Sequence, residues 1–283
     1  MSAVLALLAS VLWGTSDFLG GTASRSLPVG SVLGLSQLAA LLGLVPVALL
    51  TGELDADRAY VVPAVLAGAV GVLALAAFYR ALATGTMGVV APIAALGVVV
   101  PVAAGLLAGE APGVLQLAGI AVAVTGVVLA SGPELRGHGR GGATPLLLAL
   151  GAACGFGTVL VLIARGAESS VVMTLLTMRL TAVLLLTTAL LAVASRRGLQ
   201  LGVPRSQLPL VAAIGAGDVL ANGSFALASE TAGALVSVTS VLASLYPVVT
   251  VLLARQVHGE RLRRVQVAGV AAALGGVVLL AGG

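Results

Sequence analysis

The scarcity of charge along long apolar runs constrains this chain more than any other feature. Only 8% of its 283 residues are charged, whereas 59% are hydrophobic and the mean hydropathy is +1.18. A soluble domain carries about a quarter charged residues. Because a soluble fold cannot hide this much apolar surface, we predict that lipid covers it and that the chain is an all-α integral membrane protein.

Ten apolar runs are long enough to cross a bilayer as helices. A glycine- and arginine-rich connecting loop, 132–144, divides them into a first unit of five spans, 1–131, and a second, 145–283. The amino terminus has no basic n-region or small-residue cleavage site, so we expect it to be kept as the first helix. The predicted spans are 2–21, 29–50, 60–80, 86–108, 113–131, 145–164, 170–194, 208–228, 233–254 and 265–283.

The two units look like copies of one repeat. The segment 109–129 recurs 150 residues later as 259–279, with 11 identities in 21 positions, among them a Gly-Glu pair, a glutamine and two glycines. An odd number of spans in each copy makes the second copy enter the membrane from the opposite side. Inverted repeats of this kind are common in transporters, whose substrate site lies near the midplane between the halves. We therefore expect a secondary transporter that works by alternating access.

Three motifs resemble those of a known family. The run Leu12-Trp-Gly-Thr-Ser-Asp-Phe-Leu-Gly20, together with Gly109-Glu110 and Gly259-Glu260, resembles the EamA family of the drug/metabolite transporter superfamily, and the likeness spans essentially the whole chain. It implies a ten-helix carrier of small organic solutes, often an exporter, with a cavity lined mainly by spans 1, 3, 4, 6, 8 and 9. The second unit departs from the family pattern at Phe156-Gly157, where tryptophan is usual. Substrates vary widely in this family, so the resemblance names none.

Three charged residues fall inside predicted spans: Asp17, Arg179 and Asp218. A charge at bilayer depth costs at least about 2.5–3.5 kcal/mol on insertion scales, so each needs a reason. Asp218 marks a transport pathway or pairs with Arg179 to stabilise the bundle, and Asp17 lies in a pathway or near a hydrated interface. For Arg179 a structural role, as the partner of a buried acid, is more typical than a role in transport.

Helical spacing gathers further polar and aromatic side chains on the faces of spans 1, 8 and 9. Such a pocket suits a zwitterionic or cationic organic solute, such as an amino acid, an amine or a drug-like molecule. The serines of span 9 are explained equally well by close packing of small residues. The candidate substrate-binding residues are Trp13, Asp17, Asp218, Asn222, Phe225, Ser237, Ser240, Ser244 and Tyr246.

Several other residues fit structural roles. Glu110 and Glu260 precede the last span of each unit, where an acid complements the dipole of the helix that it opens. Pro92, Pro101 and Pro247 either kink their helices or mark broken helices that line the pathway.

The positive charge is all arginine and is distributed unevenly. The odd-numbered loops carry eleven arginines and the even-numbered loops only Arg58 and Arg165. The positive-inside rule then places both termini outside, although relatives commonly have them inside. The lack of lysine and the bias to alanine, glycine and arginine suggest a G+C-rich bacterial genome, so we expect the protein in a bacterial inner membrane. Asp218, and less clearly Asp17, would carry a proton in exchange for substrate.

Other functional classes find little support. One cysteine and two distant histidines offer no metal cluster, and we expect no cofactor. The arginines lie in short loops, as topology determinants do, so we expect no nucleic-acid partner. A membrane-embedded enzyme would need a catalytic grouping that the sequence lacks. A non-transporting sensor or scaffold stays an alternative. Glycine-rich faces are compatible with a monomer or a homodimer.

Overall fold

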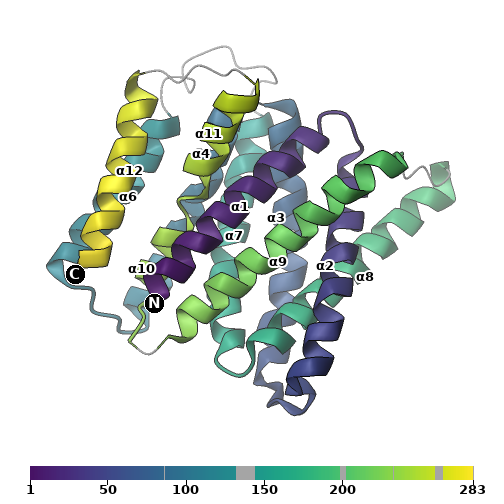
Figure 1. Cartoon of the computed structure of the whole chain (residues 1–283), viewed down its shortest axis with the longest axis horizontal. Coiled ribbons are helices and arrows are strands. Elements are labelled where there is room, and N and C mark those ends of the chain that lie inside the picture. The colour runs from purple at the N-terminus through teal and green to yellow at the C-terminus, as the bar shows by residue number, and fades with distance from the viewer. Residues whose placement is uncertain (86, 132–143, 198–201, 232, 259–263, 283) are drawn as a thin grey trace.

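The computed structural model describes residues 1–85, 87–131, 144–197, 202–231, 233–258 and 264–282, and over these residues the chain is all-helical, with no strand (Figure 1). The helices are α1 Ser2–Ala23, α2 Val29–Thr51, α3 Val61–Thr84, α4 Met87–Ala95, α5 Val99–Leu107, α6 Val114–Ser131, α7 Thr144–Ala167, α8 Val171–Arg197, α9 Leu208–Glu230, α10 Val236–Ala243, α11 Tyr246–His258 and α12 Arg264–Gly282.

Seven helices of the described chain are long and apolar enough to cross a membrane. They comprise α1, α2, α3, α7, α8, α9 and the combined run of α10 and α11, while two shorter apolar helices cover Ile93–Leu107 and Val114–Gly126. Large apolar side chains point outward along them, with Leu50 87% and Leu73 70% exposed. Exposure of such an apolar surface to water is unfavourable, whereas the hydrocarbon of a bilayer can cover it.

Two predicted continuous spans are broken into half-helices. Between α4 and α5 lies the short 3₁₀ turn Leu96–Val98, and two residues, Ser244 and Leu245, separate the end of α10 from the start of α11. Proline has no N–H to donate to the carbonyl four residues earlier. For Pro101 that carbonyl belongs to Gly97, and for Pro247 it belongs to Ala243, so each break falls where a proline removes a helix hydrogen bond.

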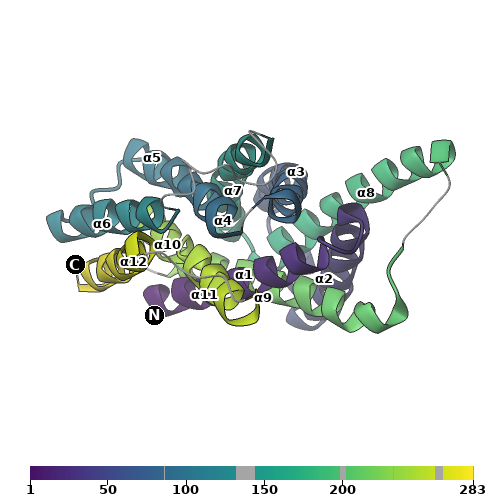
Figure 2. The same cartoon turned by 90° about the horizontal axis from the view of Figure 1, so that it is seen from above.

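The main helix contacts join the first half of the chain (α1–α6) to the second (α7–α12). Helix α1 packs on α9, α3 on α7, α2 on α8, and α6 on α12 at one edge of the bundle (Figure 1). Seen from above, α3 and α7 lie on one side of the molecule and α1 and α9 on the other (Figure 2). We call these pairs the α3/α7 wall and the α1/α9 wall.

Two glycines allow equivalent close crossings between the halves. A Cβ atom on Gly68 of α3 would lie 2.5 Å from the backbone oxygen of Met178 in α8. A Cβ atom on Gly215 of α9 would lie 2.1 Å from the backbone oxygen of Ser36 in α2. Only glycine lets the backbones approach this closely, as is common where helices associate in lipid.

We expect Gly215→Ala to destabilise the protein by about 1–3 kcal/mol, because the added methyl group must push α2 and α9 apart. Gly43→Ala in α2 is the matched control, since its Cβ would meet nothing within 4 Å. Thermal unfolding of both variants in one detergent measures the difference. Equal melting temperatures for the two variants would contradict the crossing.

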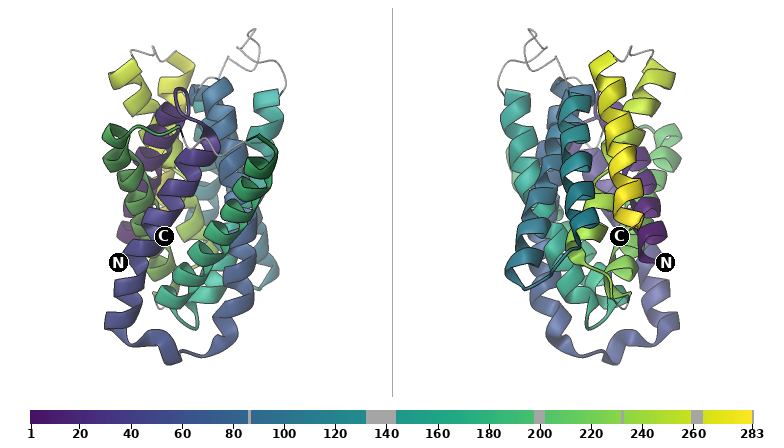
Figure 3. Two further views of the ribbon diagram at one scale, coloured as in Figure 1. Left: turned by 90° about the vertical axis from the view of Figure 1, so that its right-hand side faces the viewer. Right: turned by 90° about the vertical axis from the view of Figure 1, so that its left-hand side faces the viewer.

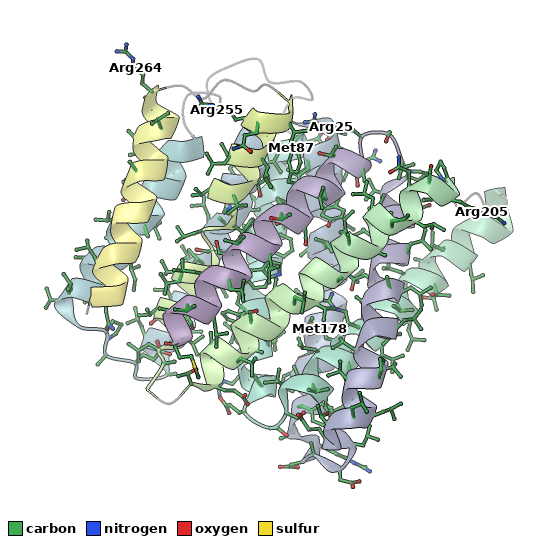
Figure 4. All side chains as sticks on the ribbon, viewed as in Figure 1. Arg25, Met87, Met178, Arg205, Arg255 and Arg264 are labelled. Atoms are coloured by element: carbon green, nitrogen blue, oxygen red, sulfur yellow. The ribbon has the colours of Figure 1, made fainter. Side chains whose placement is uncertain are left out.

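Opposite charges gather at opposite ends of the bundle. Arg25, Arg205, Arg255 and Arg264 lie at one end (Figure 4). The connection from α2 to α3 lies at the other end (Figure 3) and carries three acids, Glu53, Asp55 and Asp57, against one arginine, Arg58. The arginine asymmetry seen along the sequence thus becomes a separation of charge in space.

Candidate functional site

A cavity lies between the α1/α9 wall and the α3/α7 wall. It holds about 800 Å³ of empty space, including a part open to the outside. Both broken helices reach it, through Ala94, Ala95, Gly97 and Val98 and through Ser244 and Tyr246. The other lining residues are Trp13, Asp17, Gln37, Ala67, Gly68, Gly71, Val72, Leu75, Phe156, Gly157, Val159, Leu160, Met178, Arg179, Ala182, Asp218 and Asn222.

An ion pair holds one side of the cavity. The Arg179 Nη1 atom lies 2.8 Å from Asp218 Oδ2 and also donates to Gln37 Oε1 at 2.7 Å. The Asn222 amide donates to Asp218 Oδ1 at 2.9 Å and to the Asp218 backbone oxygen at 2.6 Å. Gln37 Nε2 completes the group at 3.5 Å from Asp218 Oδ2. These four residues join α2, α8 and α9, and the charge of Asp218 is balanced.

Asp17 has no such partner. Its side chain is buried, with 8% exposed, and lines the cavity. Within the described residues its carboxylate makes no hydrogen bond and no ion pair. The Tyr246 hydroxyl, also at the cavity, is buried without a hydrogen-bond partner among the described residues. Buried polar groups are normally satisfied, so the unsatisfied Tyr246 hydroxyl, together with the unpaired Asp17 carboxylate at the same cavity, indicates a ligand-binding site.

Aromatic rings close around the same space. Trp13 packs on Phe225 with ring centroids 5.9 Å apart. Phe78 lies behind the lining and makes edge-to-face contacts with Phe156 at 5.3 Å and Tyr246 at 6.5 Å. These rings give the cavity apolar, rigid surfaces that favour an apolar or aromatic group.

The structure brings most of the candidate binding residues together. Trp13, Asp17, Asp218, Asn222, Ser244 and Tyr246 all line the cavity. Phe225, Ser237 and Ser240 do not. Phe225 is fully buried behind Trp13, Ser237 bonds to Glu110, and the Ser240 hydroxyl is buried with no described partner.

Glu110 differs from its expected role. It does not lie in the first turn of α6, which begins at Val114 and whose leading N–H, on Gly113, is bound at 2.9 Å by Gln116 Oε1. The Glu110 carboxylate instead accepts the backbone N–H groups of Val236 and Ser237 at 2.8 and 3.1 Å and the Ser237 hydroxyl at 2.6 Å. Glu110 therefore caps α10, a helix of the other half.

The other residues given structural roles divide as follows. Arg179 forms the predicted ion pair with Asp218. Pro101 and Pro247 lie in the first turns of α5 and α11, directly after the breaks. Pro92 lies within α4, and Glu260 lies outside the described residues.

Sequence reasoning missed Gln37 and Phe156. Gln37 is the single amide in the long apolar run of α2, a signal that would have found it. Phe156 was noted only as a departure from the usual tryptophan, yet it lines the cavity as Trp13 does.

Comparisons with known proteins agree with this arrangement. The EamA-like transporter family matches residues 1–132 and 143–282. A solved structure named "Crystal structure of protein" is similar with a TM-score of 0.73 and 19% sequence identity, over 98% of this chain and 95% of that one, and so shares the fold. No curated protein matches the chain. The family match covers nearly the whole sequence, and the resemblance read from its motifs is confirmed. This multi-pass membrane protein belongs to the EamA-like transporter family, whose members are transporters.

Proposed function

We propose that the protein is a secondary transporter that exports a small organic metabolite, an amino acid, amine or drug-like solute, across a bacterial inner membrane by alternating access. The observation that carries the proposal is the cavity between the two halves of the chain. Its lining is mostly apolar, includes residues of both broken helices, and contains Asp17, which has no partner among the described residues. Transport sites are typically built from discontinuous helices at a repeat interface.

We propose ten spans in two inverted repeats, with α4–α5 and α10–α11 each forming one discontinuous span and with α6 and α12 also crossing. The equivalent crossings at Gly68 and Gly215 support this arrangement. Around them, Gly68-Ala69 and Val72-Leu-Ala74 recur 147 residues further on as Gly215-Ala216 and Val219-Leu-Ala221. The repeat is present both in the sequence and in the helix contacts. The two halves therefore have equivalent contact surfaces, which suits a rocking motion of one half against the other.

The direction of insertion follows from the charged ends of the bundle. The arginine-rich end is assigned to the cytoplasm and the end carrying Glu53, Asp55 and Asp57 to the outside, together with both termini. Labelling of single cysteines introduced at positions 25 and 55 of the Cys154→Ser protein tests the assignment. Access to position 25 from the outside of intact cells would reverse it.

Asp17 is the stronger candidate for proton coupling. Asp218 is already held by Arg179 and Asn222, so a proton there would break an ion pair. Asp17 has no described partner to lose and is free to take a proton when substrate leaves.

A flux assay tests the proposed function. We expect the protein in lipid vesicles to exchange internal for external radiolabelled solute from a panel of amino acids, amines and neutral metabolites. Gly71→Phe should bring exchange down to the level of empty vesicles, because the new ring fills the cavity that Gly71 lines. Gly43→Phe, whose side chain enters open space on α2, should leave exchange unchanged. Exchange that survives in Gly71→Phe would show that solute takes another route.

A further inference from the structure

The charges in the cavity lining do not cancel. Its charged residues are Asp17, Arg179 and Asp218. Arg179 and Asp218 form an ion pair, so together they leave no net charge. Asp17 therefore gives the lining an excess of one negative charge. A buried charge of this kind is stable only with a partner, and none is present among the described residues.

The repeat indicates how the polar groups are distributed over the cavity. Trp13-Gly-Thr15 corresponds to Phe156-Gly-Thr158, which pairs Asp17 with Leu160. The match around Gly68 and Gly215 pairs Asp218 with Gly71 and Asn222 with Leu75. All six residues line the cavity.

In each of these pairs the polar member lies on the α1/α9 wall and the apolar member on the α3/α7 wall. The two walls lie on different sides of the molecule (Figure 2), and residues from both line the cavity. Two walls of the same ancestry have thus become chemically different, one acidic and hydrogen-bonding, the other apolar. A ligand that satisfies both is charged at one end and apolar at the other.

We infer that the transported solute is an organic monocation, an amine or quaternary ammonium compound, whose cationic group lies against Asp17 and whose apolar body lies on the α3/α7 wall. The inference rests on the proposed function and narrows its substrate class. Trp13 lies one helical turn from Asp17 on α1, and Tyr246 lines the same cavity. Aromatic faces next to a carboxylate are well suited to a cationic group.

The same lining disfavours the other classes of solute. An amino acid would bring its own carboxylate, so its net charge is zero and it would leave the excess negative charge of the lining uncompensated, because Asp218 already balances the charge of Arg179, the only cation among the described lining residues. An anion would meet the uncompensated Asp17. A metal ion would need several oxygen ligands, and apolar residues make up the opposite wall. A neutral solute has no charge to offer the Asp17 carboxylate, so it could not take the place of a proton there.

Fluorescence of Trp13 provides a direct binding assay, because it is the chain's only tryptophan and lines the cavity. The probes form a series with one aromatic body: 2-phenylethylamine, 2-phenylethanol, 3-phenylpropionate and phenylalanine, with tetraethylammonium as a second cation. We expect the two cations to change the fluorescence of the purified protein with saturation, and the other three to have little effect. Asp17→Asn should weaken binding of protonated 2-phenylethylamine roughly 10- to 100-fold, the usual strength of a hydrogen bond to a charged group. Binding of tetraethylammonium, which has no N–H to donate, should weaken as well, because the carboxylate charge is lost.

Asp17→Glu keeps the negative charge and should bind the cations more tightly than Asp17→Asn does. Asp55→Asn, which changes an exposed acid in the connection from α2 to α3, should bind them as tightly as the unchanged protein. Melting temperatures show whether each variant is folded. Binding of phenylethanol or phenylalanine as tight as that of phenylethylamine would overturn the inference. So would cation binding that is unchanged in a folded Asp17→Asn protein.

Vesicle exchange separates this inference from the proposed function. If the vesicles exchange neutral or zwitterionic solutes but no cation, the protein is a transporter and the cation assignment is wrong. If cations bind at Asp17 yet no solute of any class is exchanged, the cation site stands and the transport proposal fails.

Discussion

Asp218→Ala should destabilise the protein by about 3–5 kcal/mol, the usual result of removing one partner from a buried ion pair. The Arg179 side chain is 5% exposed, and its Nε and Nη2 atoms already lack partners among the described residues. Without Asp218, Gln37 alone would face the guanidinium, through a single hydrogen bond. Chemical unfolding of the purified protein in detergent, followed by Trp13 fluorescence, measures the loss.

The double variant Arg179→Met/Asp218→Ala should recover most of that stability. Replacing a whole buried pair with apolar residues is often neutral, because no charge is left without a partner. A double variant as unstable as Asp218→Ala alone would mean that the pair is not the source of the effect. The two single variants, Asp218→Ala and Arg179→Met, and the double variant together form a thermodynamic cycle that isolates the energy of the ion pair.

Glu110→Ala should cost about 3 kcal/mol, less than the sum of its three hydrogen bonds at about 1.5–3 kcal/mol each, because the side chain is half-buried and water replaces part of what is lost. Those bonds come from the first residues of α10, whose N–H groups have no partner within their own helix. Hydrogen exchange of the backbone amides of Val236 and Ser237 should speed up most. The loss should therefore begin at α10, in the half of the chain that does not contain Glu110.

Gln116→Ala is the matched control for Glu110. Gln116 also binds a backbone N–H, but locally, on Gly113 and at an exposed site. Its removal should cost about 1 kcal/mol and leave exchange at α10 unchanged. Faster exchange at α10 in Gln116→Ala would show that the whole loop, and not the carboxylate, holds that helix.

The outline of the fold was readable from the sequence because lipid imposes a simple rule on composition. Apolar runs of sufficient length predicted where the helices lie, and the observed bounds of α2 and α9 differ from the predicted spans by no more than two residues. The two breaks were harder to predict. A proline does not always interrupt a helix, since Pro46 lies inside the unbroken α2.

The cavity residues that could be predicted were those costly to bury. Asp17, Arg179 and Asp218 needed a reason to be in the membrane, and all three line the cavity. Ser237 was placed with them by helical spacing, but spacing cannot show that a carboxylate from another half reaches it first. Contacts between distant segments, such as the cap by Glu110, leave no local pattern in the sequence.

The carboxylate of Asp17, which has no partner among the described residues, also has an electrical consequence. If Asp17 is neutralised by a proton on one journey across the membrane and by a monovalent cation on the other, the net charge carried in one full cycle is zero. Moving one charge through 100 mV is worth about 2.3 kcal/mol, and an electroneutral exchange would draw none of it. Such a carrier would respond to a difference in acidity across the bilayer and be indifferent to voltage, and would keep working in a cell whose membrane potential has collapsed.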